Sequence, residues 1–108
     1  MTDYRATMRV ELVNDRPTYA EVVIESLDRA IRHVAWPVDG SHLKALEAAA
    51  SQSIDLLEAR ATGVSQELLR TTGFELNEPW TVDRETFPAE DGGTCGSIEA
   101  SAVVSGEL

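Results

Sequence analysis

The sequence predicts an α+β fold in which an antiparallel helical hairpin, extended by a short third helix, packs on a small three-stranded sheet, in the order β-α-α-(α)-β-β. Three patterns predict it. Residues 5–12 alternate apolar and polar side chains, residues 18–61 repeat apolar side chains at steps of three and four, and residues 79–104 return to alternation. A chain of 108 residues is long enough for one such domain and too short for two, so residues 1–108 are expected to form a single small domain.

The first element is expected to be a half-buried strand at residues 5–12. Met8 and Val10 fall on one side of an extended chain and Arg9 falls on the other. Met8 and Val10 should point inward, because shifting the register by one residue would bury charge instead. The segment 14–17, Asn-Asp-Arg-Pro, ends the strand.

A first helix is expected over residues 18–35. It would begin at a capping box, Thr18 to Glu21, in which the hydroxyl and the carboxylate satisfy backbone N–H groups. Trp36-Pro37 would end the helix, because a proline disfavours the helical region in the residue before it. Its apolar stripe comprises Ala20, Val23, Ile24, Leu27, Ile31 and Val34.

A second helix is expected over residues 42–61, after a turn at residues 39–41, and a short third helix over residues 65–72 before Gly73. The first two helices carry apolar stripes that suit an antiparallel hairpin with a short loop. The core of that hairpin is expected to comprise Leu27, Ile31, Leu46, Ala50, Ile54 and Leu57.

Two further strands are expected at residues 79–87 and 98–104, where polar and apolar side chains alternate. Between them, residues 88–97 contain three glycines and two acids and are expected to form a flexible loop. A sheet this small has two edges, and an edge strand offers unpaired backbone groups to another chain. An edge-to-edge homodimer is one arrangement that the pattern favours.

Charge is concentrated in the last third of the chain. Residues 73–108 contain eight acidic residues and one basic residue, Arg84, and so carry −7 of the formal net charge of −10. Such a surface attracts basic groups and repels phosphate, so the sequence favours a basic protein partner and disfavours nucleic acid. The expected partner-binding residues are Trp36, Glu78, Trp80, Asp83, Glu85, Glu90 and Asp91.

The two tryptophans join this set because each lies beside a proline at the boundary of an expected element. Tryptophan is frequent at the energetic centre of protein interfaces. Trp36 and Trp80 could equally cap the ends of a small core, and the sequence leaves both interpretations open.

No motif commits the chain to a reaction, a cofactor or a metal. Cys95 lies in a Gly-rich segment with no nearby cation to activate its thiol. His33 and His42 could meet across the hairpin loop, but they lack the close spacing of a zinc site. The acids of residues 75–91 do not follow a calcium-loop motif, and paired catalytic carboxylates would need a pocket that the sequence does not predict. Structural or incidental roles are favoured for all of these residues.

The sequence shows no basic region followed by an apolar run at its start and no uninterrupted apolar run of about eighteen residues, so neither a signal peptide nor a membrane span is expected. One cysteine fits a reducing compartment, and the expected location is the cytoplasm.

Two functional hypotheses follow from the charge and the expected fold. The first is a small, non-enzymatic interaction protein of a bacterium or its phage, with an inhibitor-, antitoxin- or adaptor-like role, that binds a partner through its acidic last third or a sheet edge. The second is a dimeric ligand-binding or catalytic domain with a pocket between helices and sheet. A deep pocket with convergent polar groups would favour the second, and a flat acidic face the first.

Overall fold

The computed structural model describes residues 1–28 and 31–108, and in these residues six strands form one sheet that packs against two helices. The strands are β1 (Thr2–Val13), β2 (Arg16–Ser26), β3 (Arg32–Pro37), β4 (Glu75–Leu76), β5 (Thr81–Pro88) and β6 (Thr94–Gly106). The helices are α1 (Gly40–Ala50) and α2 (Ile54–Thr71).

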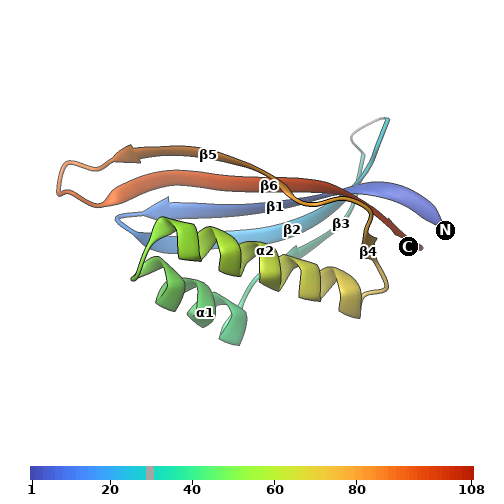
Figure 1. Ribbon diagram of the computed structural model, residues 1–108, viewed down its shortest axis with the longest axis horizontal. Coiled ribbons are helices and arrows are strands. Elements are labelled where there is room, and N and C mark those ends of the chain that lie inside the picture. Colours follow the sequence, from blue (N-terminus) through green and yellow to red (C-terminus); the bar gives the residue numbers. More distant parts are fainter. Residues whose placement is uncertain (29–30) are drawn as a thin grey trace.

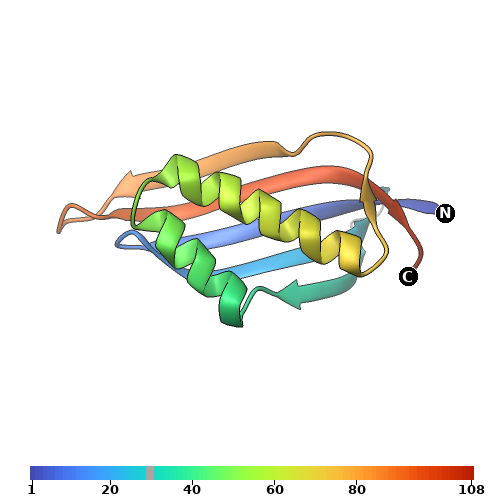
Figure 2. The same ribbon diagram turned by 60° about the horizontal axis from the view of Figure 1, so that its bottom comes forward.

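The sheet is antiparallel throughout, with the strand order β3-β2-β1-β6-β4. β5 also pairs with β6, along residues that pair with β1 on their other side, so β5 and β4 share the side of β6 away from β1. Both helices lie on one face of the sheet (Figures 1 and 2). The sheet therefore has a covered face and an open face.

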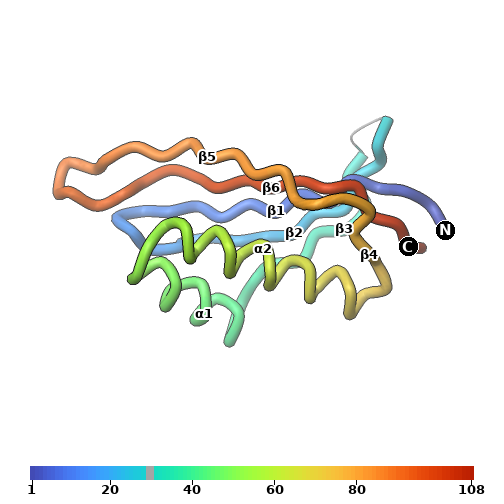
Figure 3. The backbone as a smooth tube through the Cα atoms, in the orientation of Figure 1, coloured from blue at the N-terminus to red at the C-terminus, as the bar shows by residue number. Residues whose placement is uncertain are grey.

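The first strand, β1, and the last strand, β6, pair with each other in the middle of the sheet. β1 pairs with β6 from Thr2 opposite Gly106 to Leu12 opposite Gly96. The N- and C-termini consequently lie at the same end of the molecule, and the β1–β2 and β5–β6 turns lie at the other end (Figure 3). The candidate surface described below is built on this central pair.

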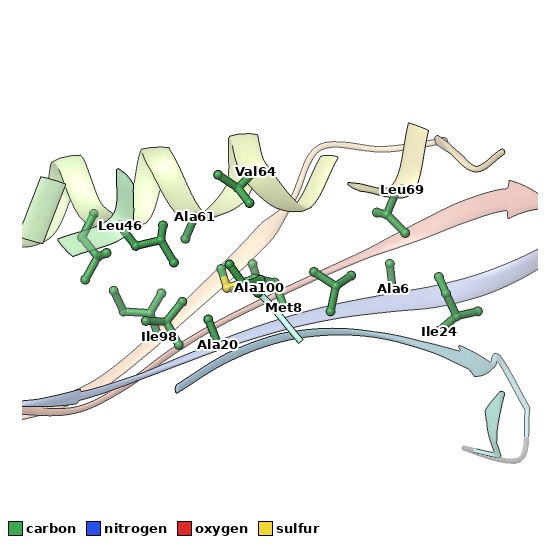
Figure 4. Close-up of a cluster of buried hydrophobic side chains, with 14 of the residues drawn as sticks. Ala6, Met8, Ala20, Ile24, Leu46, Ala61, Val64, Leu69, Ile98 and Ala100 are labelled. Atoms are coloured by element: carbon green, nitrogen blue, oxygen red, sulfur yellow. The ribbon is translucent and has the colours of Figure 1, made fainter. Parts of the chain in front are cut away.

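The core fills the space between the helices and the covered face (Figure 4). β1, β2 and β6 each turn every second residue inward, as an extended chain requires, and the helices add one apolar stripe each. The largest fully buried apolar side chains are Met8, Ile24, Leu46, Leu57, Leu69, Ile98, Val10, Val22 and Val104.

The predicted α+β fold class, a helical hairpin on a three-stranded sheet, is wrong, because the molecule is predominantly a six-stranded sheet. The largest error is the helix predicted at residues 18–35, which forms β2 and β3, residues 29 and 30 lying outside the described part. The cause lies in the preceding turn. Asn14 and Asp15 both adopt positive φ, 50° and 66°, which is the geometry of the two-residue turn that folds strands into a hairpin.

Pairing with β1 then decides the conformation of the next residues. Ala20, Val22 and Ile24 alternate inward against β1, so the apolar spacing that suits a helix also suits a strand. Leu27 and Ile31, predicted in the core, lie 45% and 49% exposed near the β2–β3 connection. A capping box does not form.

The second predicted helix, 42–61, is interrupted at residues 51–53. Ser51 Oγ donates to the carbonyl of Ala48 at 2.7 Å, and Ser53 caps α2 by accepting from the N–H of Leu56 at 3.0 Å. These local bonds end one helix and start the next, as serine side chains do at helix termini. The third helix predicted at 65–72 is the C-terminal part of α2. Leu46 and Leu57 are buried as predicted, while Ala50 and Ile54 are partly buried.

The strands predicted at residues 5–12, 79–87 and 98–104 are confirmed as β1, β5 and β6. β1 and β6 extend beyond the predicted bounds at both ends, whereas β5 begins two residues later and ends one residue later than predicted. Met8 and Val10 point inward as predicted. The Gly-rich segment 88–97 contributes the ends of β5 and β6 and the turn between them. In the described residues no helix is both long and apolar enough to span a bilayer.

Candidate functional site

The open face of the sheet is a mainly polar surface. Its central part is formed by every second residue of β1, β2, β5 and β6, namely those whose side chains point away from the helices. Its centre holds small side chains, among them Val23, which is only 3% exposed although no helix covers it. Longer charged side chains surround this centre. The central part of the open face comprises Arg5, Thr7, Arg9 and Glu11 of β1, Tyr19, Glu21, Val23 and Glu25 of β2, Ser97, Glu99, Ser101 and Val103 of β6, and Thr81, Asp83 and Glu85 of β5.

Arg9 is the cation nearest the acidic part of this face. Its Nε lies 3.3 Å from Glu11 Oε1 and its Nη1 lies 3.9 Å from Glu99 Oε1. These pairs are roughly half exposed, so each contributes little to stability. Arg9 therefore divides one positive charge between two carboxylates.

Asp83 lies directly opposite Glu99 in the β5–β6 ladder. Like charges in directly opposite positions of an antiparallel pair repel each other, and the neighbouring Glu85 adds a third carboxylate to the same face. A hollow of about 310 Å³ lies beside Asp83 and Glu99. Its other lining residues are Arg5, Thr7, Thr81, Ala100 and Ser101.

Arg84, the only cation of residues 73–108, points to the covered face. Its Nη2 donates to Asp55 Oδ1 and its Nε to Glu58 Oε1, both at 2.7 Å, which ties β5 to α2. The hydrogen bond to Asp55, followed by that to Glu58, raises the pKa of Arg84. Because this guanidinium is engaged on the covered face, it does not neutralise Asp83 and Glu85 on the open face.

Tyr19 and Glu21 form a second polar contact on the open face. The Tyr19 hydroxyl donates to Glu21 Oε2 at 2.6 Å, and this bond is the main reason that the pKa of Tyr19 lies above its ordinary value. Glu21 Oε1 also lies 3.8 Å from Arg32 Nη2, a pair that links β2 to β3.

The structure separates the predicted partner-binding residues into groups. Asp83 and Glu85 lie together on the open face of β5. Glu78 accepts a hydrogen bond from the N–H of Val103 at 2.8 Å, between β4 and β5. Glu90 and Asp91 lie in the turn between β5 and β6, where Asp91 Oδ1 accepts from the N–H of Gly93 at 3.4 Å.

The two tryptophans lie at opposite edges of the sheet. Trp36, in β3, packs edge-on against Phe74 with ring centroids 6.4 Å apart. Trp80 precedes β5 and packs on the core, where its Nε1 is buried without a hydrogen-bond partner in the described part of the chain. Both side chains contact the core, and of the two only Trp80 adjoins β5, the strand that carries Asp83 and Glu85.

The histidines and the cysteine do not converge. His33 Nε2 lies 2.6 Å from Ser26 Oγ and its ring packs edge-on against Tyr4, whereas His42 lies in α1. Cys95 Sγ accepts from the N–H of Asn14 at 3.5 Å. Across residues 1–28 and 31–108, no three His, Cys, Asp or Glu side chains are grouped so that they could hold a metal ion.

A second hollow, of about 390 Å³, lies at the turn end of the molecule, where residues 51–53 face Leu12, Asp15 and Thr94. Asp15 Oδ1 already accepts from the N–H of Thr94 at 2.9 Å, and the Ser53 hydroxyl already caps α2. The Asp15 carboxylate and the Ser53 hydroxyl are thus already engaged in local structure. Core side chains fill the space farther in, between the helices and the covered face.

Glu99 and Arg9 are the residues that sequence reasoning missed. Both fall on the polar side of correctly predicted strands, but only the register places Glu99 between Asp83 and Arg9. The chain matches no protein-family model, and no curated protein or solved structure shows significant similarity to it.

Proposed function

We propose that the protein is a small, non-enzymatic binding module that takes a basic segment of a partner protein on the open face of its sheet. The observation that carries the proposal is the opposition of Asp83 and Glu99 across β5 and β6, beside a hollow of about 310 Å³. Two facing carboxylates repel each other when the surface is free. A lysine or arginine side chain placed between them relieves that repulsion.

The surroundings of this acidic pair favour a peptide-like ligand. Thr7, Thr81 and Ser101 line the hollow with hydroxyl groups, which donate and accept hydrogen bonds. The surface is broad and follows the strands, so an extended segment can lie along it. The module acts by binding, and we place it in the cytoplasm, a location supported by its lone cysteine.

Long-range charge supports the same ligand. The surplus of seven negative charges in residues 73–108 attracts a basic chain before contact, and such steering raises association rates more than it slows dissociation. Added salt should therefore slow association, because charges separated by more than about 8–10 Å are screened near physiological ionic strength.

The test is a titration of the protein, followed by NMR amide shifts, with a synthetic peptide that alternates Lys and Thr, compared with a peptide that alternates Glu and Thr. We expect the Lys-Thr peptide alone to shift the amides around Thr81, Asp83, Glu99 and Ser101. The double variant Asp83→Asn/Glu99→Gln should weaken this binding at least tenfold.

The matched control is Glu90→Gln/Asp91→Asn, which removes the same two charges from the β5–β6 turn. It should retain binding within about twofold. Equal losses in the two double variants would show that only net charge matters, and shifts confined to the helices would place the site elsewhere. Either result would overturn the proposal.

A further inference from the structure

The two outer edges of the sheet differ in how they are protected against pairing with another chain. β5 carries Asp83 and Glu85 in exposed positions, and charged side chains on an edge strand oppose further pairing. β3 carries no acidic residue, and its one permanently charged side chain, Arg32, lies near Glu21 of the adjacent strand. In the described part of the chain, no strand pairs with β3 on its outer side.

We infer that β3 is a self-association edge, at which a second copy of this chain adds its own β3 antiparallel to the first. A two-fold axis perpendicular to the sheet at Ala35 places Ala35 opposite Ala35 of the second copy, and Val34 opposite Trp36 of the second copy on the covered face. The two sheets then continue into one another, with the helices of both copies on the same face. Such an isologous contact closes on itself and makes a dimer.

Side-chain complementarity favours a second copy as the occupant. Val34 and Trp36 both point to the covered face, so the pairing sets a β-branched side chain opposite an aromatic ring, a combination that stabilises antiparallel strands. The same contact occurs twice, by symmetry. The middle of the strand is without fixed charge, so no like charges meet. Two β5 edges joined in the same way would bring four carboxylates together, from Asp83 and Glu85 of each copy.

Apolar burial favours the same pairing. Val34 and Trp36 are partly buried and lie at the rim of the core, so the apolar layer of the covered face ends at β3. A second β3 would extend this layer across the two-fold axis. Ile31, just before the strand, is 49% exposed. The ladder would end at Pro37, which has no N–H to donate.

The test is the mass of the protein in solution, measured by sedimentation equilibrium from low micromolar to millimolar concentration. We expect the wild type to approach twice the monomer mass. Ala35→Glu and Ala35→Lys each place like charges near the two-fold axis and should leave monomers, while an equimolar mixture of the two variants should recover the dimer. The control, Thr81→Glu on β5, should dimerise like the wild type.

Amide hydrogen exchange gives an independent readout that needs no variant. Protection of the β3 amides in the wild type should rise with protein concentration, while β1 and β6 should be protected in every variant because the fold is retained. A wild type that stays monomeric to millimolar concentration would overturn the inference. So would dimerisation of Ala35→Glu alone, or a mixture of the two charge variants that stays monomeric. None of these results depends on peptide binding at Asp83 and Glu99.

Discussion

The two faces of β1 show how one strand serves two purposes. Ala6, Met8, Val10 and Leu12 point to the helices and are no more than 4% exposed. The residues between them, from Arg5 to Glu11, point to the open face and remain partly or fully in contact with solvent. The buried side chains of the covered face therefore supply most of the stabilisation from β1. The side chains of its open face can vary with little loss of stability, so they are available for binding.

The largest expected loss of stability follows a substitution on the covered face. Met8→Ala should lower the free energy of unfolding by about 2–5 kcal/mol, because it removes a buried side chain and leaves a cavity in the core. Chemical denaturation measures this change. The adjacent open-face substitution Thr7→Ala should cost about 1 kcal/mol or less. Similar losses at Met8 and Thr7 would contradict the division between the two faces.

A smaller loss of stability is expected when the ion pairs that link α2 to β5 are removed. Arg84→Met keeps much of the side-chain volume and removes both ion pairs to Asp55 and Glu58. Because both pairs keep contact with solvent, at Asp55 above all, the loss of stability should be about 1 kcal/mol or less. Hydrogen exchange should show faster opening of β5 with little change in β1. Unchanged exchange in β5 would mean that Arg84 does not hold this strand.

A small gain in stability is expected from a substitution on the open face. Asp83→Asn removes one of two facing carboxylates and should raise the stability of the free protein by a few tenths of a kcal/mol. The same change should weaken binding of the Lys-Thr peptide. Glu90→Asn, in the β5–β6 turn, serves as the control with no facing acid in the ladder. A loss of stability in Asp83→Asn would argue against repulsion at this pair.

The smallest effect is spectroscopic. The hydrogen bond to Glu21 raises the pKa of Tyr19 above its ordinary value, so the phenol ionises at higher pH than a free tyrosine. In a Tyr4→Phe background, which leaves one tyrosine, Glu21→Gln should lower the midpoint of an alkaline ultraviolet titration. An unchanged midpoint would show that the Tyr19–Glu21 bond does not persist in solution.

The sequence contains enough information to predict β1, β5 and β6, because their alternation has no helical counterpart. It is ambiguous at residues 20–24, where Ala20, Val23 and Ile24 suit a helix while Ala20, Val22 and Ile24 suit a strand. The positive φ of Asn14 and Asp15 resolves this ambiguity by turning the chain back onto β1. A positive φ at two successive residues that are not glycine is uncommon, and composition alone does not reveal it.

The candidate site also contains residues that the sequence alone predicts and residues that only the fold brings there. The excess of acids locates Asp83 and Glu85 from sequence, because net charge needs no knowledge of the fold. Glu99 and Arg9 join them only through strand register, which depends on residues far apart in the chain. Trp36 was predicted as a member of the same partner-binding set, but it lies in β3 at the edge of the sheet opposite Asp83 and Glu85.

Pairing the first strand with the last also sets the order of events during synthesis. β1 leaves the ribosome early, but its partner β6 ends at Gly106, so the central ladder cannot close until almost the whole described chain has been made. Contacts of such wide sequence separation slow folding. Until then, of the described elements, β1, β2 and β3 can pair and the helices can form, and the edge of β1 that later receives β6 stays open to other nascent chains.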